Sequence, residues 1–505
     1  MQSVVYEKGL GPPPVAFNMA AHVLQHARLT PDKPALEILH PDGPQIWTYQ
    51  RLEAETLGTA TGLLNLGLKP GARVILRLGN TADFPITYLA CIAVGLIPVP
   101  LSTQLTACEV RKISAAIRPA CTIQSDDTPP ATGQTLSADT LCAFHDLPAA
   151  AYQLGDPDRP AYIIHTSGTS GQARAVVHAH RAVWARQMMW DGWYGLRACD
   201  RLLHAGAFNW TYTLGTGLMD PWAIGATALI PAEGCDAARL PALLAQTHAT
   251  IFAAAPGVYR RFLRADIPSL PELRHGLSAG EKLPEAVKSA WTKITGTHVH
   301  EAFGMSECST FISGSPACPA PRGASGFAQP GRRVAIVDSG LPVARGAVGT
   351  IAIDRHDAGL MLGYLDAAAE TAAKFDGDWF LTGDLGVMDA AGAITYAGRA
   401  DDMMNAGGFR VSPIEVETAL TTHPAIAETA AAQVQVKPDV HVIAAFYVST
   451  DVIEDADLAA FCAQTLAGYK CPRLFVRVDT LPRGANNKLL RRVLRQDWEA
   501  AHGQT

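Results

Sequence analysis

The chain has 505 residues, of which 48% are hydrophobic and 17% charged, and its formal net charge is −6 at pH 7. A chain of this length is too long for one hydrophobic core and is expected to form about two to four domains. It has no run or stripe of lysine and arginine, so no nucleic-acid partner is expected.

The N-terminal residues contain no apolar core of signal-peptide length. The longest apolar stretch, Tyr88–Leu101, is interrupted by prolines and is too short to span a membrane, so it predicts a buried helix that leads into a strand. The cysteines are scattered without a CxxC pair, which indicates neither a disulfide framework nor a zinc site. These features favour a cytoplasmic protein with no membrane span.

Up to about residue 400, short apolar runs alternate with longer amphipathic segments. Examples are "ARVILRL" before "TADFPITYLACIAVG", and "ATALIPA" after "GLMDPWAIG". Strands of this kind, separated by helices, are typical of parallel sheets covered by helices. The predicted fold class is α/β, with a large N-terminal domain of parallel or mixed sheets flanked by helices.

A loop rich in serine, threonine and glycine interrupts Tyr162–His178, "YIIHTSGTSGQARAVVH". We expect an apolar strand before it and a helix after it, opened by His178 and His180. Glycines let successive N–H groups point at an anion, and a helix start adds positive potential. The loop matches neither the Walker A nor the GxGxxG pattern. It is therefore either a phosphate-binding loop with Arg174 as its cation or a flexible polar loop.

The pattern changes in "GRADDMMNAGGFRVSPIEVETAL", which begins at Gly398. Its Gly407–Gly408 pair predicts a hairpin turn. Ser412 as N-cap, with Glu415 three residues later, predicts a helix that begins with a capping box. The segments "VHVIAAFYV", "DADLAAFCAQTLA" and "LFVRVD" then predict a strand, a helix and a strand, which together make a small α+β domain.

Several motifs follow the loop in order: "SAGEKL", "EAFGMSEC", "WFLTGDLG", "GRADDMMNAGGFRVSPIEVE", "YKCPR" and "LPRGANNKLLRR". In this order the chain, from Phe17 to Arg495, resembles the adenylate-forming superfamily, which includes acyl-CoA synthetases, firefly luciferase and peptide-synthetase adenylation domains. The loop resembles the family's "TSGTTGxPKG", and "FGMSE" resembles "YGxTE". The segments "GAFNWTYTLGTGLMDPWAIGA" and "FNMAAHVLQH" look most like medium-chain and aromatic acid:CoA ligases of the benzoate type.

The resemblance implies an acid:CoA ligase that uses ATP, Mg²⁺ and CoA. A carboxylate attacks the α-phosphate of Mg-ATP, pyrophosphate leaves and an acyl-adenylate forms, after which a thiol takes the acyl group and AMP departs. Because the carboxylate and the triphosphate repel each other, cations must neutralise the charge that develops. The implied partners are a small-molecule carboxylic acid and CoA, and a homodimer is left open.

The same resemblance assigns residues to the nucleotide. Lys488 matches the catalytic lysine that bridges the carboxylate and the α-phosphate, and Glu307 matches the acidic ligand of Mg²⁺. Phe303 would stack on adenine, and Asp384, on a tight "TGD" turn, would accept both ribose hydroxyls. Arg399 matches the other ribose contact. The predicted nucleotide-binding residues are Thr166, Ser167, Gly168, Thr169, Ser170, Gly171, Arg174, Gly280, Glu281, Lys282, Glu301, Ala302, Phe303, Gly304, Met305, Ser306, Asp384, Arg399, Arg410 and Lys488.

The resemblance also implies a C-terminal domain that moves between the two half-reactions. The predicted domains are residues 1–400, which bind AMP and the acyl group, and residues 401–505, which carry the catalytic lysine. Asp401 matches the hinge, and the catalytic residues are Lys488, Arg399 and Asp401. Gly407 and Gly408 would lie where the pantetheine arm of CoA approaches.

The acyl pocket is assigned by the same analogy. Its predicted lining is Asn209, Trp210, Tyr212, Ala279, Ala302, Gly304, Met305 and Ile312. Acetate-specific relatives look to have Trp at the position of Gly304, so this glycine leaves room for more than two carbons. No cation is evident in the lining, which favours an uncharged medium-chain or aromatic acid. Either His204 or Asn209 takes the place of the family's pocket histidine.

Some positions depart from the family pattern. Arg174 replaces the usual loop lysine, and Asn487 replaces the glycine before the catalytic lysine. Two alternatives therefore stay open: a stand-alone enzyme that loads a carrier protein, and a non-catalytic relative that binds AMP or acyl groups. Cys308, beside Glu307, is expected to be a buried thiol with no catalytic part, since the mechanism needs no such nucleophile.

Overall fold

The computed structural model describes residues 1–6, 10–126, 128, 133–166, 174–400, 402–406, 409–437, 440–484 and 489–502. The chain divides into two compact units. Unit 1 consists of Met1–Val4, Ala335–Ala352 and Leu381–Thr505, and unit 2 of Val5–Val334 and Ile353–Phe380.

Unit 2 contains a nine-stranded sheet in the order β16-β15-β14-β13-β12-β10-β11-β2-β3. In that order the strands are Phe327–Ala328, Ser309–Ser313, His298–Met305, His275–Ala279, Ile251–Ala254, Arg201–His204, Thr227–Pro231, Pro34–His40 and Gly43–Thr48. The six strands from β14 to β2 are parallel, and β15, β16 and β3 pair antiparallel. The carboxyl ends of the parallel strands therefore share one edge, where open α/β sheets usually bind ligands.

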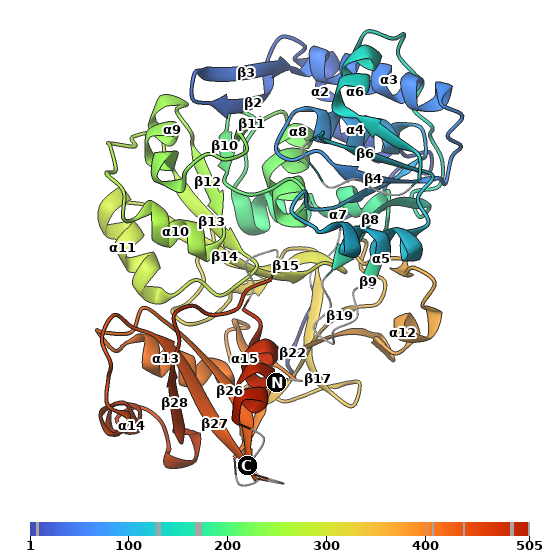
Figure 1. Cartoon of the computed structure of the whole chain (residues 1–505). Coiled ribbons are helices and arrows are strands. Elements are labelled where there is room, and N and C mark those ends of the chain that lie inside the picture. Colours follow the sequence, from blue (N-terminus) through green and yellow to red (C-terminus); the bar gives the residue numbers. More distant parts are fainter. Residues whose placement is uncertain are drawn as a thin grey trace. The chain divides into compact units, whose positions relative to one another are not determined.

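Neighbouring residues of these strands face opposite sides of the sheet and pack into separate clusters. Phe252 packs with Trp291 in one cluster, and Ile251 packs with Trp193 in another. Figure 1 shows α9, α10 and α11 beside this sheet. The helices of unit 2 are α1 Met19–Val23, α2 His26–Leu29, α3 Tyr49–Asn65, α4 Asp83–Ala93, α5 Ala107–Ile117, α6 Ala138–His145, α7 Arg181–Ala185, η1 Trp190–Tyr194, η2 Thr213–Met219, α8 Asp220–Ile224, η3 Ala237–Arg239, α9 Leu240–Gln246, α10 Pro256–Phe262, α11 Glu285–Thr295 and α12 Ala368–Ala372.

Two smaller sheets complete unit 2, together with β21 (Phe375–Asp376). A parallel sheet has the order β5-β4-β6-β7, with the strands Ile97–Pro100, Arg73–Arg77, Cys121–Gln124 and Thr135–Ser137. An antiparallel sheet has the order β20-β9-β8, with the strands Gly363–Tyr364, Arg174–Ala179 and Pro160–Thr166. This second sheet holds both ends of the hydroxyl-rich loop.

In unit 1, strands β1, β17, β19 and β22 form a sheet, with β18 paired to β17 and β23 paired to β22. These strands are Val4–Tyr6, Arg333–Asp338, Val348–Asp354, Trp379–Met388, Leu341–Pro342 and Ile394–Arg399. Along the chain, the boundaries between the two units fall within strands β1, β17, β19 and β22.

The C-terminal part of unit 1 has a three-stranded sheet, β26-β27-β28, with Val416 and Leu458 packed on one face and Leu494 on the other. Its elements are β24 Met404–Ala406, β25 Phe409–Val411, α13 Pro413–Thr421, β26 Glu428–Lys437, β27 Val440–Val448, α14 Asp455–Ala463, η4 Gly468–Lys470, β28 Leu474–Arg477 and α15 Arg491–His502. The predicted strand, helix and strand of this region are confirmed.

The start of α13 differs in detail from the prediction. Ser412 caps the helix, but its Oγ accepts from the N–H of Ile414 at 3.2 Å, which is one residue earlier than a capping box requires. The Glu415 carboxylate lies 2.8 Å from Lys470 Nζ, so this glutamate serves an ion pair instead. The predicted capping box is therefore wrong, although the predicted N-cap is confirmed.

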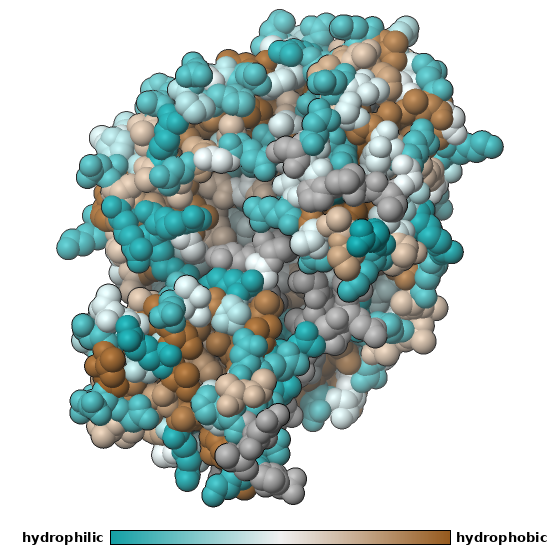
Figure 2. Space-filling view, viewed as in Figure 1, coloured by the Kyte–Doolittle hydropathy of each residue, from teal (hydrophilic) through white to brown (hydrophobic). Residues whose placement is uncertain are grey.

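Figure 2 shows hydrophilic residues over most of the visible face, with apolar residues between them. Two buried ion pairs join Arg332 with Asp357 and Arg186 with Asp220. In the part of the chain that the structure describes, no helix has both the length and the apolar character needed to cross a bilayer.

Candidate functional site

Strands β8 and β9 are the two legs of a hairpin, with Thr166 opposite Arg174. The predicted helix directly after the loop is wrong, because β9 follows it, His178 lies in β9, and α7 begins only at Arg181. Short apolar runs do not distinguish a helix from a strand, and here β9 pairs with strands on both sides. The loop residues Ser167, Gly168, Thr169, Ser170 and Gly171 lie outside the described residues.

Arg174, the predicted loop cation, contacts an aromatic ring and a carboxylate. Its guanidinium carbon lies 4.9 Å from the centroid of the Tyr364 ring, and its Nε lies 3.0 Å from Glu370 Oε2. The Arg174 side chain is 29% exposed and that of Glu370 is 47% exposed. The cation is therefore held at a partly exposed position that a solute can reach.

Glu307, the predicted metal ligand, is fixed through both its side chain and its backbone. The Tyr364 hydroxyl donates to Glu307 Oε1 at 2.7 Å, and the N–H of Met361 donates to the Glu307 carbonyl at 2.7 Å. Burial, together with the Glu307 charge, raises the pKa of Tyr364, so the phenol stays protonated as a donor. Tyr364 thus contacts both predicted ionic groups, Glu307 and Arg174.

The ends of β13 and β14 carry further predicted nucleotide residues. Gly280 follows β13 with φ +94°, and a Cβ there would lie 2.9 Å from the Trp210 ring, so only glycine suits this position. The Glu301 carboxylate already has partners within the protein: Lys288 forms an ion pair with it, and the N–H of Leu283 donates to it at 2.6 Å.

The end of β14 leads into a turn. Phe303 meets Phe311 edge to face with ring centroids 5.5 Å apart. The Ser306 carbonyl lies 2.7 Å from His178 Nε2, which ties the turn to β9. Lys282 Nζ, after β13, donates to the Gly323 carbonyl at 3.3 Å.

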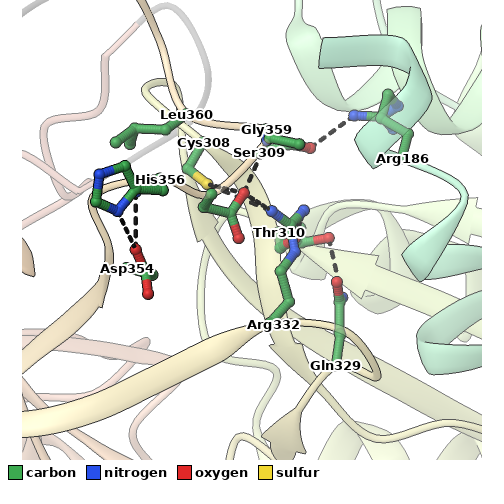
Figure 3. A network of polar contacts seen from close by, with 12 residues as sticks. Arg186, Cys308, Ser309, Thr310, Gln329, Arg332, Asp354, His356, Gly359 and Leu360 are labelled. Carbon is green, nitrogen blue, oxygen red and sulfur yellow. Dashed lines mark hydrogen bonds and ion pairs between the residues drawn. The ribbon is translucent and has the colours of Figure 1, made fainter. Parts of the chain in front are cut away.

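A buried polar network anchors the residues after Glu307. Arg332 pairs with Asp357, and its Nη1 donates to Cys308 Sγ at 3.7 Å (Figure 3). Arg186 Nη1 donates to Ser309 Oγ at 2.6 Å. Cys308 is fully buried, and burial holds the pKa of its thiol well above the usual range. The prediction that Cys308 is a buried thiol is confirmed.

Four predicted acyl-pocket residues share one hydrophobic cluster: Trp210, Tyr212, Ala279 and Ala302. Ala279 and Ala302 are partners on β13 and β14, and Ile312 of β15 is the partner of Phe303. Asn209 directly precedes Trp210 in the chain and is half-buried, as is Met305 at the end of β14.

His204 lies at the end of β10, fully buried, with its ring edge to face on Tyr212 and the centroids 4.4 Å apart. Neither ring nitrogen has a hydrogen-bond partner among the described residues. Burial lowers the pKa of His204 to about 3, so the ring is neutral at neutral pH. It adds a polar group without charge beside the cluster.

Gly304 has a backbone reason to be glycine. A Cβ there would lie 2.2 Å from the Ser309 carbonyl oxygen and 2.5 Å from Thr310 Cα. The register of β14 and β15 shifts between Phe303 and Gly304, which brings the two backbones together at this point. The absence of a side chain at Gly304 therefore allows the backbone of β15 to approach, in addition to any effect on the acyl pocket.

Unit 1 carries the predicted ribose contacts. Asp384 and Arg399 are partners on β22 and β23, and the Tyr396 hydroxyl donates to Asp384 Oδ1 at 3.4 Å. The predicted "TGD" turn is wrong, because these residues lie within β22, where Gly383 has φ +80°. The N–H of Asp384 donates to Thr382 Oγ1 at 3.0 Å.

Some predicted residues lie outside the described part of the chain: Asp401, Gly407, Gly408 and Lys488. The strands beside Gly407–Gly408 pair antiparallel, with Ala406 opposite Phe409. Arg410 lies on β25, opposite Asn405.

Sequence reasoning missed Tyr364 and Glu370. The signal available was "LGYLDAAAET", in which a single aromatic residue stands beside a glycine and shortly before an acidic residue. Nothing in that spacing indicates that the tyrosine contacts Glu307, which is 57 residues away in the chain.

The described residues contain no group of three or more His, Cys, Asp or Glu able to hold a metal ion. A single carboxylate nevertheless fits Mg²⁺, which in nucleotide sites is held by one or two carboxylates, waters and phosphate oxygens. Glu307 is such a carboxylate, with one oxygen oriented by Tyr364.

Comparison with known proteins gives consistent matches. Residues 23–365 match the AMP-binding enzyme family, and residues 415–488 match the AMP-binding enzyme C-terminal domain. Benzoate–CoA ligase of Thauera aromatica is 30% identical over 483 residues, which cover 89% of this chain and 90% of the relative. Human mitochondrial acyl-coenzyme A synthetase ACSM2A is 29% identical, with coverage of 96% and 92%. The crystal structure of the anthranilate CoA ligase AuaEII with anthranoyl-AMP superposes with a TM-score of 0.86 at 26% identity, covering 97% of this chain and 99% of that one.

Proposed function

Because the chain belongs to the AMP-binding enzyme family, we propose that it is an ATP-dependent carboxylic acid:CoA ligase acting on an uncharged medium-chain or aromatic acid. The acid attacks the α-phosphate of ATP and releases pyrophosphate, and the acyl-adenylate then acylates CoA and releases AMP. The observation that carries the proposal is that β14 runs from an apolar cluster at Ala302 to the turn that carries Glu307, whose carboxylate Tyr364 connects to the cation Arg174.

The phosphate groups are assigned to unit 2. Arg174 neutralises phosphate charge, and its planar guanidinium can contact two oxygens at once. Glu307 would hold Mg²⁺, which when bound supplies further positive charge at the transferring phosphoryl group. The loop hydroxyls of Thr166–Ser170 supply donors.

The adenosine is assigned to Phe303, Gly280 and Glu281 for the base, and to Asp384 and Arg399 for the ribose. Asp384 is a carboxylate acceptor of the kind that binds two vicinal hydroxyls. Lys488 supplies the ammonium group between the two reacting anions, an assignment supported by the family motif around it.

The acid is assigned to the apolar cluster of Trp210, Tyr212, Ala279 and Ala302. The neutral ring of His204 beside it adds no charge. A charged acyl tail would be desolvated there without a partner, which is costly. The relatives named for benzoate and the bound anthranoyl-AMP of the solved structure support an aromatic acid.

The acceptor is assigned as CoA, and Gly407 and Gly408 are assigned to the place where its pantetheine arm approaches. Residues 401–505 move as a domain about Asp401 between the two half-reactions, which lets one active site perform two chemistries. We place the enzyme in the cytoplasm, where its scattered cysteines stay reduced.

A panel of straight-chain, branched and aromatic acids tests the proposal, scored by pyrophosphate release with and without CoA and by CoA-dependent AMP formation. We expect AMP formation with at least one uncharged acid. Accumulation of acyl-AMP in the presence of CoA would indicate a carrier-loading enzyme instead. No release with any acid would favour a non-catalytic binding protein.

A further inference from the structure

Three segments that are distant in the sequence of unit 2 meet at Tyr364. Strand β20 pairs with β9, where Tyr364 lies opposite Val176, and the N–H of Leu365 donates to the Ala175 carbonyl at 2.8 Å. On the other side, the N–H of Met361 donates to the Glu307 carbonyl at 2.7 Å. The backbone of Tyr364 is therefore fixed between the strand that begins at Arg174 and the turn that carries Glu307.

Both the hydroxyl and the aromatic ring of Tyr364 make contacts. Its hydroxyl donates to Glu307 Oε1, and its ring face supports the Arg174 guanidinium. Tyr364 is 5% exposed, so the ring has little freedom to leave these contacts. One side chain thus connects the candidate metal ligand with the candidate phosphate cation.

Glu370 is placed by the same segment. The N–H of Tyr364 donates to Thr371 Oγ1 at 2.9 Å, which ties α12 to β20. Glu370 on α12 then pairs with Arg174 Nε at 3.0 Å. Because both side chains are partly exposed, this ion pair is weak and can exchange for a stronger anion.

The replacement of the usual lysine by Arg174 fits this arrangement. A guanidinium is flat and can stack on a tyrosine ring while its edge N–H groups contact an anion. From its position over the Tyr364 ring, Arg174 can exchange the Glu370 carboxylate for phosphate oxygens without leaving the ring.

We propose that Tyr364 is a positioning residue for the metal–triphosphate group, and that Glu370 is the anion that Arg174 releases when the triphosphate binds. This inference rests on the proposed function. Tyr364 orients Glu307 through its hydroxyl, and it orients Arg174 through its ring and, in part, through the same hydroxyl.

Binding measurements separate these contributions without turnover. Affinity for ATP is measured by calorimetry in EDTA, and Mn²⁺ binding to the ATP complex by electron paramagnetic resonance. The variants are Tyr364→Phe, Tyr364→Leu and Glu370→Gln. Matched controls are Tyr6→Phe, at an exposed tyrosine, and Glu272→Gln, whose 44% exposed carboxylate pairs with His248 at 3.4 Å.

Tyr364→Phe should weaken Mn²⁺ binding about 10-fold, in the range for loss of an outer contact to a metal ligand, and should change metal-free ATP affinity less than Tyr364→Leu does. Tyr364→Leu should also weaken metal-free ATP binding about 2- to 5-fold, because the cation–π contact is lost. Glu370→Gln should tighten metal-free ATP binding by about 2- to 5-fold, since a competing anion is removed. Both controls should match the wild type.

Unchanged Mn²⁺ binding in Tyr364→Phe would overturn the positioning role, and unchanged or weaker ATP binding in Glu370→Gln would overturn the exchange. A wild-type protein that binds no ATP would overturn the proposed function, and this inference with it. A wild-type protein that binds ATP, beside variants that behave like it, would overturn this inference alone.

Discussion

Asp384 and Arg399 occupy opposed positions on β22 and β23, and Arg399 Nη1 lies 3.5 Å from Asp384 Oδ1. Asp384 is only 6% exposed, so the neighbouring cation stabilises a carboxylate that would otherwise lose much of its hydration. A charged acceptor held in this way is suited to bind two adjacent hydroxyl groups.

Asp384→Asn should therefore weaken recognition of the ribose. We expect the KM for ATP to rise about 10- to 100-fold, the range for a lost hydrogen bond to a charged group. The wild type should prefer ATP to 2′-deoxy-ATP, and the variant should lose most of this preference. A variant with the wild-type preference would exclude Asp384 as the ribose acceptor.

Lys488→Ala should cripple adenylation by about 10²- to 10³-fold, as expected for loss of a preorganised charge contact. It should spare thioester formation from supplied acyl-AMP and CoA, because that step joins no carboxylate to a phosphate. Rapid-quench measurement of each half-reaction separates the two. Equal losses in both would show that Lys488 is not the adenylation lysine.

Asp401→Pro should have the opposite profile. Proline fixes φ at the predicted hinge, so a large backbone change between two domain positions is blocked. We expect acyl-AMP to form at nearly the wild-type rate and thioester formation to fail. If adenylation were lost and thioester formation retained, the hinge assignment would be wrong.

Gly304→Ala should lower the free energy of unfolding by about 1–3 kcal/mol, because the added Cβ presses on the Ser309 carbonyl and forces β15 to shift. Urea denaturation measures this loss. Gly468→Ala is a matched control, since nothing lies within 4 Å of a Cβ there. An equally stable Gly304→Ala variant that selects shorter acids would mean that this glycine serves the pocket alone.

Stability should fall in mild acid, in part through His178. Burial lowers the pKa of His178 to about 4, below the usual value of 6.5. Between these two values the unfolded chain binds more protons than the folded chain, so the free energy of unfolding falls as pH falls. Replacing His178 by Gln should reduce the loss between pH 7.5 and pH 5 by about 2 kcal/mol. Denaturant titrations at both pH values measure the difference, and an identical loss in the variant would contradict it.

The strands and helices of the C-terminal region were predictable because each is a local pattern bounded by turn residues. Strand β27 coincides with "VHVIAAFYV", and α13 begins at the residue after its predicted cap, Ser412. The helix expected after the hydroxyl-rich loop was not found, because "RAVVHA" pairs with β8 and β20, which lie on either side of it in the sheet. Its partners are set by the tertiary fold and are not visible in the short run itself.

In the candidate site, too, residues in local motifs were predictable, whereas residues brought in by long-range pairing were not. The motif order indicated Arg174 and Glu307, since each stands in a segment that resembles a family element. Tyr364 was missed because its contact with Glu307 depends on β20 pairing with β9, a long-range event. The crowding at Gly304 likewise comes from the backbone of a neighbouring strand.

The hydroxyl-rich loop is flanked by β8 and β9, so no helix dipole begins where it ends. Attraction of a polyanion to this place then depends chiefly on the side-chain charge of Arg174, which is 29% exposed and thus open to counterions. Salt screens exposed charges over about 10 Å at 0.1 M ionic strength. Triphosphate capture by this protein should accordingly decline as buffer salt increases.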